Sequence, residues 1–187
     1  MRAVKHSDKR ERLVNAARGL FHRHGYGETS LADIARESGV PVGNVYYYFK
    51  TKEDIAAAVI EQHREYVSGI ARTAEAMPTA RERITSMLDS LACNCHAIAD
   101  SGCPMGSLCV EFGKIDTALR EEANRLLLRM IEWVERQFSA MGRSDAHALA
   151  IQLVATVQGA SVLALAMHDP GILRQELGRL KTVVEGL

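Results

Sequence analysis

Aromatic residues make up only 5% of this 187-residue chain, which contains four prolines and a single tryptophan. Strands favour aromatic and β-branched side chains, so this scarcity argues against a β-rich protein. Apolar residues at 47% and charged residues at 25% are typical of a globular protein. Alanine, leucine, arginine and glutamate are plentiful and favour helices, so we expect an all-α fold.

Long apolar segments and a secretory signal are also missing. No uninterrupted apolar run reaches the ~18–20 residues of a membrane-spanning helix. The N-terminal sequence MRAVKHSDKRERLV is polar and lacks the apolar core of a signal peptide. We therefore expect a cytoplasmic protein without a membrane partner. In that compartment the four cysteines are expected to be free thiols.

The formal net charge is zero, but the charges are unevenly distributed. Residues 1–52 contain ten Lys and Arg against five Asp and Glu, whereas residues 53–187 contain thirteen against eighteen. A basic N-terminal segment on an acidic body indicates a polyanion bound at one end. Chance clustering of solvated charges is the alternative interpretation.

Apolar residues recur at helical spacing along the whole chain and predict about nine helices without strands. In the first helix, Asp8 and Glu11 have the spacing of a capping box, with Ser7 as a competing cap. Asp116 or Thr117 is expected to open a later helix. The expected helices, with Ser144 capping the eighth, cover residues 8–24, 30–39, 42–49, 52–76, 79–100, 104–113, 116–140, 144–168 and the segment from 169 onward.

The sequence LADIARESGVPVGNVYYYF at residues 31–49 has the pattern of a helix-turn-helix. Gly39 allows the sharp turn between its two short helices. Ile34, Val40 and Val45 are apolar where these helices must pack. The second helix would lie in the major groove of a DNA duplex with its N-terminal residues near the base edges.

Several side chains around this motif suit contacts with DNA. The amide of Asn44 can pair with adenine, Val42 can contact a thymine methyl, and Gly43 permits close approach of the backbone. Successive helical residues point about 100° apart, so three adjacent tyrosines cannot all be buried. Hydroxyl, ammonium and helix N-terminal groups suit phosphates. The predicted DNA contacts are Thr29, Ser30, Val42, Gly43, Asn44, Tyr46, Tyr47 and Lys52, with a basic arm of Arg2, Lys5, Lys9 and Arg10.

The stretch from Leu13 to Ile55 resembles the N-terminal domain of the TetR family of bacterial regulators. It carries the matching segments AARGLFHRHGY, TSLADIARESGV and VYYYFKTKEDI. The resemblance implies a three-helix DNA-binding domain at residues 1–52 and a ligand-binding and dimerisation domain at residues 53–187. It also implies that Thr29, Val42, Asn44, Tyr46, Tyr47 and Lys52 face DNA. Many members carry a Ser-Lys-like pair where this chain has Pro41 and Val42, so the operator sequence stays open.

The last two expected helices, within residues 144–187, are rich in apolar residues. IQLVATVQGASVLALAM is apolar nearly all round, and ILRQELGRLKTVV has one apolar face. Self-association as a two-fold homodimer would cover these surfaces. The resemblance implies a four-helix dimer bundle, and an intramolecular core is the alternative. Such a dimer would read pseudo-palindromic double-stranded DNA.

The resemblance further implies a pocket for a small-molecule effector among the middle helices. The predicted lining residues are Met87, Leu91, Cys103, Phe112, Met130 and Trp133. An ordinary core position is the alternative for each of them.

All four cysteines lie between Cys93 and Cys109. Cys93 and Cys95 would diverge by about 200° on a helix, so we expect neither a metal site nor a cofactor. Cys103 precedes Pro104 and should cap a helix, where free N–H groups favour a reactive thiolate. GCPMGSLCVEFG also resembles a segment in a subset of the same family, some members of which respond to electrophiles. A small residue near a turn is the alternative reading of Cys103.

The leading hypothesis is a transcriptional repressor that a small molecule or an electrophile releases from its operator, and not an enzyme. The first alternative is a thiol-dependent redox protein that uses Cys103. No C-x-x-C motif, nucleotide-binding loop or acid–base pair supports that alternative. The second alternative is a helical scaffold that does not bind DNA.

Overall fold

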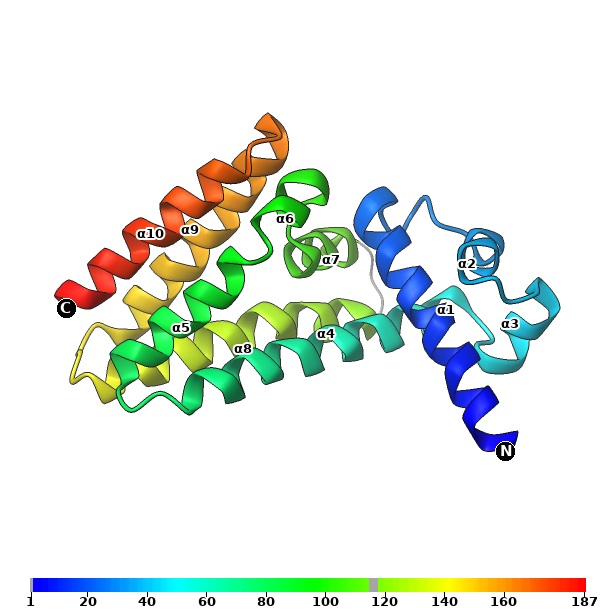
Figure 1. The fold of residues 1–187 in the computed structure, drawn as a ribbon, viewed down its shortest axis with the longest axis horizontal. Helices are drawn as coiled ribbons and strands as arrows, with labels where there is room; N and C mark the ends of the chain where they lie inside the picture. Colours follow the sequence, from blue (N-terminus) through cyan, green and yellow to red (C-terminus); the bar gives the residue numbers. More distant parts are fainter. Residues whose placement is uncertain (1, 115–117) are drawn as a thin grey trace. The chain divides into compact units, whose positions relative to one another are not determined.

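The computed structural model describes residues 2–114 and 118–187, with side chains described from Asp8 onward apart from the same gap. Within these residues the chain forms ten helices and no strand (Figure 1). The predicted all-α fold is therefore confirmed. The helices group into two compact units, one formed by residues 1–63 and 107–124, the other by residues 64–106 and 125–187.

The first unit holds the N-terminal helices. They are α1 (Arg2–His24), α2 (Leu31–Ser38), α3 (Val42–Tyr48) and the beginning of α4 (Lys52–Glu75). Helix α2 packs against both α1 and α3. Their shared core consists of fully buried apolar side chains, among them Leu13, Ala17, Ile34, Val45 and Ile55.

Local capping signals determine the ends of α2 as the sequence predicts. The Ser30 hydroxyl accepts a hydrogen bond from the Asp33 N–H at 3.2 Å, and the Asp33 carboxylate accepts one from the Ser30 N–H at 3.0 Å. This reciprocal pair satisfies two donors that a helix start leaves without partners. Gly39 ends the helix in the left-handed region, with φ of 64°, where a glycine carries no steric penalty.

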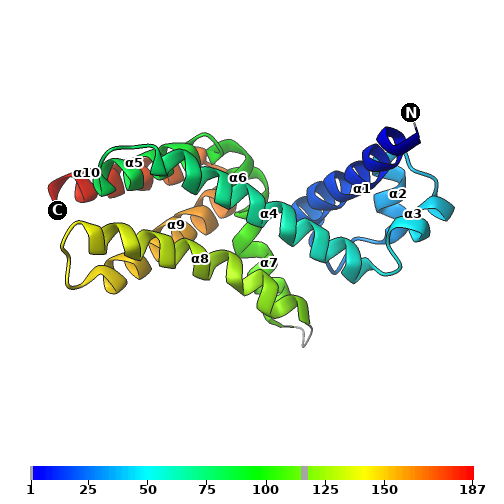
Figure 2. The same ribbon diagram turned by 90° about the horizontal axis from the view of Figure 1, so that it is seen from below.

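The second unit combines the end of α4 and the beginning of α7 (Pro104–Gly113) with most of α8 (Ala118–Ala140) and with four whole helices, α5 (Ala80–Ala92), α6 (Cys95–Ser101), α9 (Ala146–Met167) and α10 (Pro170–Gly186) (Figures 1 and 2). Helix α10 packs against α9, α5 and α6, and α6 also packs against α9. Helices α4, α7 and α8 each contribute residues to both units.

One expected helix, residues 79–100, is divided into α5 and α6. Asn94 leaves helical geometry, with φ of −102° and ψ of 5°. Its side-chain amide donates to the Ser90 carbonyl oxygen at 3.2 Å and to the Tyr66 hydroxyl at 3.0 Å. Asparagine competes with helical backbone hydrogen bonds in this way, which accounts for the break.

Two predicted helix starts were wrong, and one lies outside the described residues. Helix α1 already begins at Arg2, so Asp8 lies inside it rather than at its cap. Asp145, not Ser144, occupies the N-cap of α9, because the preceding residues form a turn. The predicted opening at Asp116 or Thr117 falls on residues that are not described.

Helix α9 is long and apolar enough to cross a membrane by the measure of length and composition alone. Within the bundle it buries Leu153, Val157, Ala160 and Ala164. These residues follow one another at helical spacing, and α9 packs against α6 and α10. Core helices of soluble proteins meet the same criteria, so this composition by itself is weak evidence for a membrane span.

Candidate DNA-binding surface and ligand cavity

The α2–turn–α3 segment has the packing of a helix-turn-helix. Ile34 and Val45 are fully buried, and Val40 in the turn is nearly so, which confirms the apolar contacts predicted between the two helices. Phe49 follows α3 and is buried beneath it. The inner side of α3 is therefore packed against the rest of the motif.

The outer side of α3 is exposed. Val42 is 46% exposed, Tyr46 50% and Tyr47 69%, and Asn44 and Gly43 are also exposed. This confirms that at least one tyrosine of the run reaches solvent. A Cβ atom added at Gly43 would meet no atom within 4 Å, so the backbone is open there. We call these five residues the α3 face.

Basic residues lie near the helix-turn-helix. The Arg10 guanidinium lies 5.1 Å from the centre of the Phe49 ring, which places a charge from α1 beside the end of α3. The Lys50 ammonium donates to the Tyr46 carbonyl oxygen at 2.8 Å. Lys9 is half-buried on α1, and the side chains of Arg2 and Lys5 lie outside the described residues.

Thr29 and Ser30, both predicted to contact DNA, have different environments. Ser30 is exposed and its hydroxyl caps α2. Thr29 is 3% exposed, and its hydroxyl donates to the Gly25 carbonyl oxygen at 2.8 Å. The Thr29 side chain therefore stabilises the α1–α2 loop from inside rather than presenting a polar group to a duplex.

The Lys52 side chain also points inward. Its ammonium donates to the carbonyl oxygens of Tyr26 and Thr29 at 2.9 Å and of Gly27 at 3.3 Å. It lies 4.2 Å from the centre of the Tyr26 ring. Lys52 thus holds the α1–α2 loop to the first turn of α4. Its spacing in the sequence gave no signal for this role, because the loop lies more than twenty residues away.

Tyr26 is the centre of an aromatic cluster in the first unit. Its ring contacts Phe21 at 5.3 Å and Phe112 at 4.7 Å between ring centres. The Tyr26 hydroxyl donates to Glu53 at 3.1 Å, and its N–H donates to Glu111. Burial, with a further contribution from the Glu53 carboxylate, raises the pKa of Tyr26 to about 12. Phe112 was predicted to line the pocket, but it is fully buried in this cluster.

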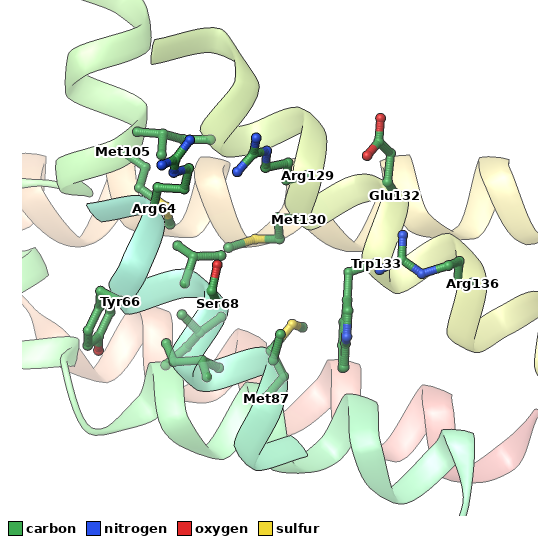
Figure 3. A pocket seen from close by; sticks show the side chains of 15 residues that line it. Arg64, Tyr66, Ser68, Met87, Met105, Arg129, Met130, Glu132, Trp133 and Arg136 are labelled. Atoms are coloured by element: carbon green, nitrogen blue, oxygen red, sulfur yellow. The ribbon is translucent and has the colours of Figure 1, made fainter. Parts of the chain in front are cut away.

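The second unit contains a cavity of about 280 Å³ among α4, α5, α7 and α8 (Figure 3). Four of the six predicted pocket residues line it, namely Met87, Leu91, Met130 and Trp133. The Trp133 indole N–H donates to a Glu75 carboxylate oxygen at 3.2 Å, which fixes the ring in the wall. The full lining comprises Arg64, Tyr66, Val67, Ser68, Ile70, Ala71, Met87, Leu91, Met105, Leu126, Arg129, Met130, Glu132, Trp133 and Arg136.

The arginines of this lining were not predicted. Arg129 and Arg136 belong to the charged side of the amphipathic helix α8 and are exposed, but they also border the cavity. The sequence nonetheless contained a signal for their place in the lining. Arg129 directly precedes Met130, and Arg136 lies one helical turn after Trp133. A side chain at the border between the two faces of a helix can reach either environment.

Comparison with protein families identifies the fold. The model of bacterial regulatory proteins of the TetR family matches residues 13–59, and the model of the LmrA/YxaF-like C-terminal domain matches residues 80–176. The HTH-type transcriptional regulator LmrA of Bacillus subtilis (strain 168) is 31% identical over 173 residues, which cover 91% of this chain and 87% of that protein. The chain belongs to the TetR family of bacterial regulatory proteins.

Further relatives agree with TetR membership. An HTH-type regulator encoded in the lacX 3′ region of Lactococcus lactis is 28% identical over 94% of this chain and 93% of its own length. A TetR regulator from Chloroflexus aurantiacus shares the fold with a TM-score of 0.83 and 27% identity over 99% of this chain and 97% of its own. A TetR regulator from Legionella pneumophila shares the fold with a TM-score of 0.84. It is 22% identical in sequence over 92% of this chain and 95% of its own length.

Membership establishes the general function. The chain is a DNA-binding transcriptional regulator, and regulators of the TetR family bind operator DNA as dimers. The relatives give no support to the alternative of a redox protein, since they are transcription regulators. The scaffold alternative is excluded by the same relatives.

The cysteines occupy four different environments. Cys93 is exposed and Cys95 is buried, and burial raises the pKa of the Cys95 thiol. Cys103 directly precedes α7 as predicted, but it does not line the cavity. Its half-buried sulfur lies 3.6 Å from the Gln158 amide nitrogen, which donates to it. The Cys109 thiol donates to the Ala123 carbonyl oxygen at 3.0 Å.

Proposed function

We propose that this regulator is a cytoplasmic repressor that binds a pseudo-palindromic operator as a homodimer and releases it when a small molecule occupies the cavity. The observation that carries the proposal is the α3 face: an exposed polar and aromatic surface on a helix whose other side is buried in a helix-turn-helix. An exposed recognition helix on a rigid frame is the geometry that major-groove reading requires.

In this proposal residues 1–52 carry the DNA contacts. Asn44 pairs with a base edge, Val42 contacts a thymine methyl, and the hydroxyls of Tyr46 and Tyr47 donate to phosphates. The exposed Ser30 lies at the N-terminus of α2, where free N–H groups favour an anionic phosphate. Thr29 and Lys52 act from inside the unit, given the hydrogen bonds that their side chains make.

Dimerisation through α9 and α10, within residues 144–187, is supported by apolar side chains that a single chain leaves exposed. Val162 and Met167 are each 65% exposed. Several exposed apolar side chains on neighbouring helices suit an interaction site, and a two-fold dimer is the commonest assembly that covers such a site. The exposed apolar residues on these two helices are Ile151, Val162, Leu163, Met167 and Val183.

Effector binding within residues 53–187 is supported by the cavity and by the helices that line it. A ligand shifts the DNA-binding equilibrium only if it binds one conformation more tightly than the other. Helices α4 and α7 line the cavity and also contribute residues to the first unit. Helix α4 follows α3 directly in the chain, so a ligand that changes α4 has a short covalent route to the helix-turn-helix.

Selection of bound sequences from random duplexes tests the proposal. We expect a palindrome with half-sites about one helical turn apart, and an affinity that falls steeply with salt because phosphate contacts release counterions. The recovery of one unpaired half-site would contradict dimeric reading. The absence of any enriched sequence would contradict specific DNA binding through the α3 face.

A further inference from the structure

Every described side chain that is buried in the cavity wall of the second unit is uncharged. The charged residues of the lining differ in exposure: Arg129, Glu132 and Arg136 are exposed, and Arg64 is half-buried and already has an interaction partner. An ion without a partner is costly to bury, so a wall of this kind favours an uncharged ligand. Its buried members are Met87, Leu91, Met105, Leu126, Met130 and Trp133.

Two polar groups on the aromatic rings of the wall already have partners inside the protein. The Trp133 indole N–H donates to a Glu75 carboxylate oxygen at 3.2 Å. An indole has one donor and no acceptor, so its capacity is used. The Tyr66 hydroxyl accepts a hydrogen bond from the Asn94 side-chain amide at 3.0 Å. These contacts hold the two rings in the wall.

The Ser68 hydroxyl, by contrast, is free to bind a ligand. Helical serines often donate to the carbonyl oxygen one turn earlier, as Ser90 does to Ser86 at 3.0 Å. Ser68 is half-buried on α4, yet its hydroxyl forms no hydrogen bond with the described part of the chain. Figure 3 shows this hydroxyl directed toward Met130, among the apolar side chains of the wall. Ser68 thus offers a neutral hydrogen-bonding group to a molecule in the cavity.

We infer that the effector is a small, uncharged, largely apolar molecule with an oxygen that accepts a hydrogen bond from Ser68. Its apolar body lies against Met87, Met130 and Trp133, because methionine side chains adapt to a ligand and the indole offers a flat apolar surface. The few polar groups of an apolar site set the orientation and identity of its ligand. Ser68 is therefore the specificity-determining residue. The inference rests on the proposed effector role of the cavity.

The size of the cavity limits the size of this molecule. A volume of about 280 Å³ lies at the lower end of the range of small-molecule sites. A ligand oxygen that enters the cavity gives up its hydrogen bonds to water, and a neutral hydroxyl replaces one of them. A carboxylate gives up much more hydration, which a single hydroxyl does not restore.

Binding can be measured without DNA, because Trp133 is the only tryptophan of the chain and lines the cavity. We suggest titrating the full-length protein with three probes while recording tryptophan fluorescence. They are 5-phenylpentan-2-one, its alkene analogue with a methylene group in place of the carbonyl oxygen, and 4-phenylbutyrate. The probes share one skeleton and end in a neutral acceptor, no acceptor and an anion. We expect the ketone to bind roughly tenfold or more tightly than the carboxylate.

Ser68→Ala tests the assigned contact through the ratio of ketone affinity to alkene affinity. The two probes differ in hydration, but this difference is the same for both proteins and cancels when their ratios are compared. The ratio should fall roughly fivefold in Ser68→Ala, which corresponds to the loss of one neutral hydrogen bond. The affinity for the alkene should not fall.

Ser90→Ala is the matched control. It removes a second half-buried helical hydroxyl, which lies outside the lining of this cavity, and should keep the wild-type ratio. Alanine favours helices at least as much as serine does, so both variants should fold. Circular dichroism melting curves verify this.

The outcomes separate this inference from the proposed function. A carboxylate that binds as tightly as the ketone, or no response to the ketone, would overturn the assigned ligand class. An unchanged ratio in Ser68→Ala, or an equal fall in Ser90→Ala, would overturn the assignment to Ser68. If the ketone binds with the expected preferences but leaves affinity for the selected operator unchanged, the ligand class holds and effector-controlled release is contradicted.

Discussion

The Lys52 ammonium lies 4.2 Å from the centre of the Tyr26 ring and donates a hydrogen bond to the Tyr26 carbonyl oxygen at 2.9 Å. Two further carbonyl oxygens of the α1–α2 loop accept hydrogen bonds from the same group. The loop sets where α2 begins, and α2 supports α3. Lys52 is therefore a positioning residue for the α3 face in this structure, although its place in the sequence predicts a phosphate contact.

Replacing Lys52 with methionine should destabilise the protein by about 1–3 kcal/mol, because carbonyl oxygens at the loop lose charge-assisted hydrogen bonds. Urea unfolding followed by circular dichroism measures the change. Lys50→Met is the control, since Lys50 is exposed and its ammonium contacts one carbonyl oxygen. The salt dependence of operator binding should keep its slope in Lys52→Met. Unchanged stability together with a slope reduced by about one would instead identify Lys52 as a phosphate contact.

Because His63 is buried in its neutral form, we expect the folded protein to lose stability in mild acid. His63 is buried in the first unit, and burial, with the positive charges of Arg18 and His22, lowers its pKa from 6.5 to about 4. The unfolded chain therefore binds a proton that the folded chain does not bind at intermediate pH. The stability that the neutral His63 side chain contributes to the folded state is fully present above about pH 6.5, and it is lost as the pH falls from there toward 4. The free energy of unfolding falls by a total on the order of 3 kcal/mol over this range.

Chemical unfolding at a series of pH values checks this expectation. His63→Gln should flatten the dependence between pH 6.5 and 4, because the variant cannot take up the proton. His147→Gln is the control, since His147 is exposed and lies 2.8 Å from a Glu135 carboxylate oxygen. A wild-type curve that is already flat in this range would contradict the account of His63.

Val162→Lys should weaken dimerisation by roughly 2 kcal/mol or more, because it places charges in the proposed apolar interface of α9 and α10. Sedimentation velocity measures the proportion of monomer. Val110→Lys is the matched control, since Val110 is also an exposed valine but lies on α7. Equal association states in both variants would show that α9 is not the interface.

Cys103 tests whether an electrophile can act as a second type of effector. If its thiol triggers release, N-ethylmaleimide should lower the operator affinity of the wild type by roughly tenfold or more, and Cys103→Ala should resist this change. The exposed Cys93 provides the control, and Cys93→Ala should respond like the wild type. Equal sensitivity of Cys103→Ala and the wild type would remove Cys103 from the regulatory mechanism.

Signals that depend on neighbouring residues in the sequence predicted the fold well. The reciprocal cap of Ser30 and Asp33, the left-handed turn at Gly39 and the exposure of the tyrosine run follow from local geometry alone. The buried faces of the first helices likewise follow from the spacing of apolar residues. Local rules act within about one turn of helix, so they needed no knowledge of the tertiary fold.

Features that depend on contacts between distant segments were not predicted. Lys52 reaches a loop that ends more than twenty residues earlier, and Phe112 packs on Tyr26 across an even longer separation. Arg64 and Arg129 likewise line one cavity although they come from two separate helices, α4 and α8. Charge and spacing give the types of side chain available, but packing alone decides which of them meet.

The most direct test of the account is a comparison of the sequences bound by the wild type and by Asn44→Ala, selected from random duplexes under identical salt. If the α3 face reads the operator, the variant should lose discrimination at one symmetry-related pair of positions, at a cost of roughly 1–3 kcal/mol, and keep its preferences elsewhere. Identical sequence preferences for the two proteins would contradict the central claim that α3 reads the operator.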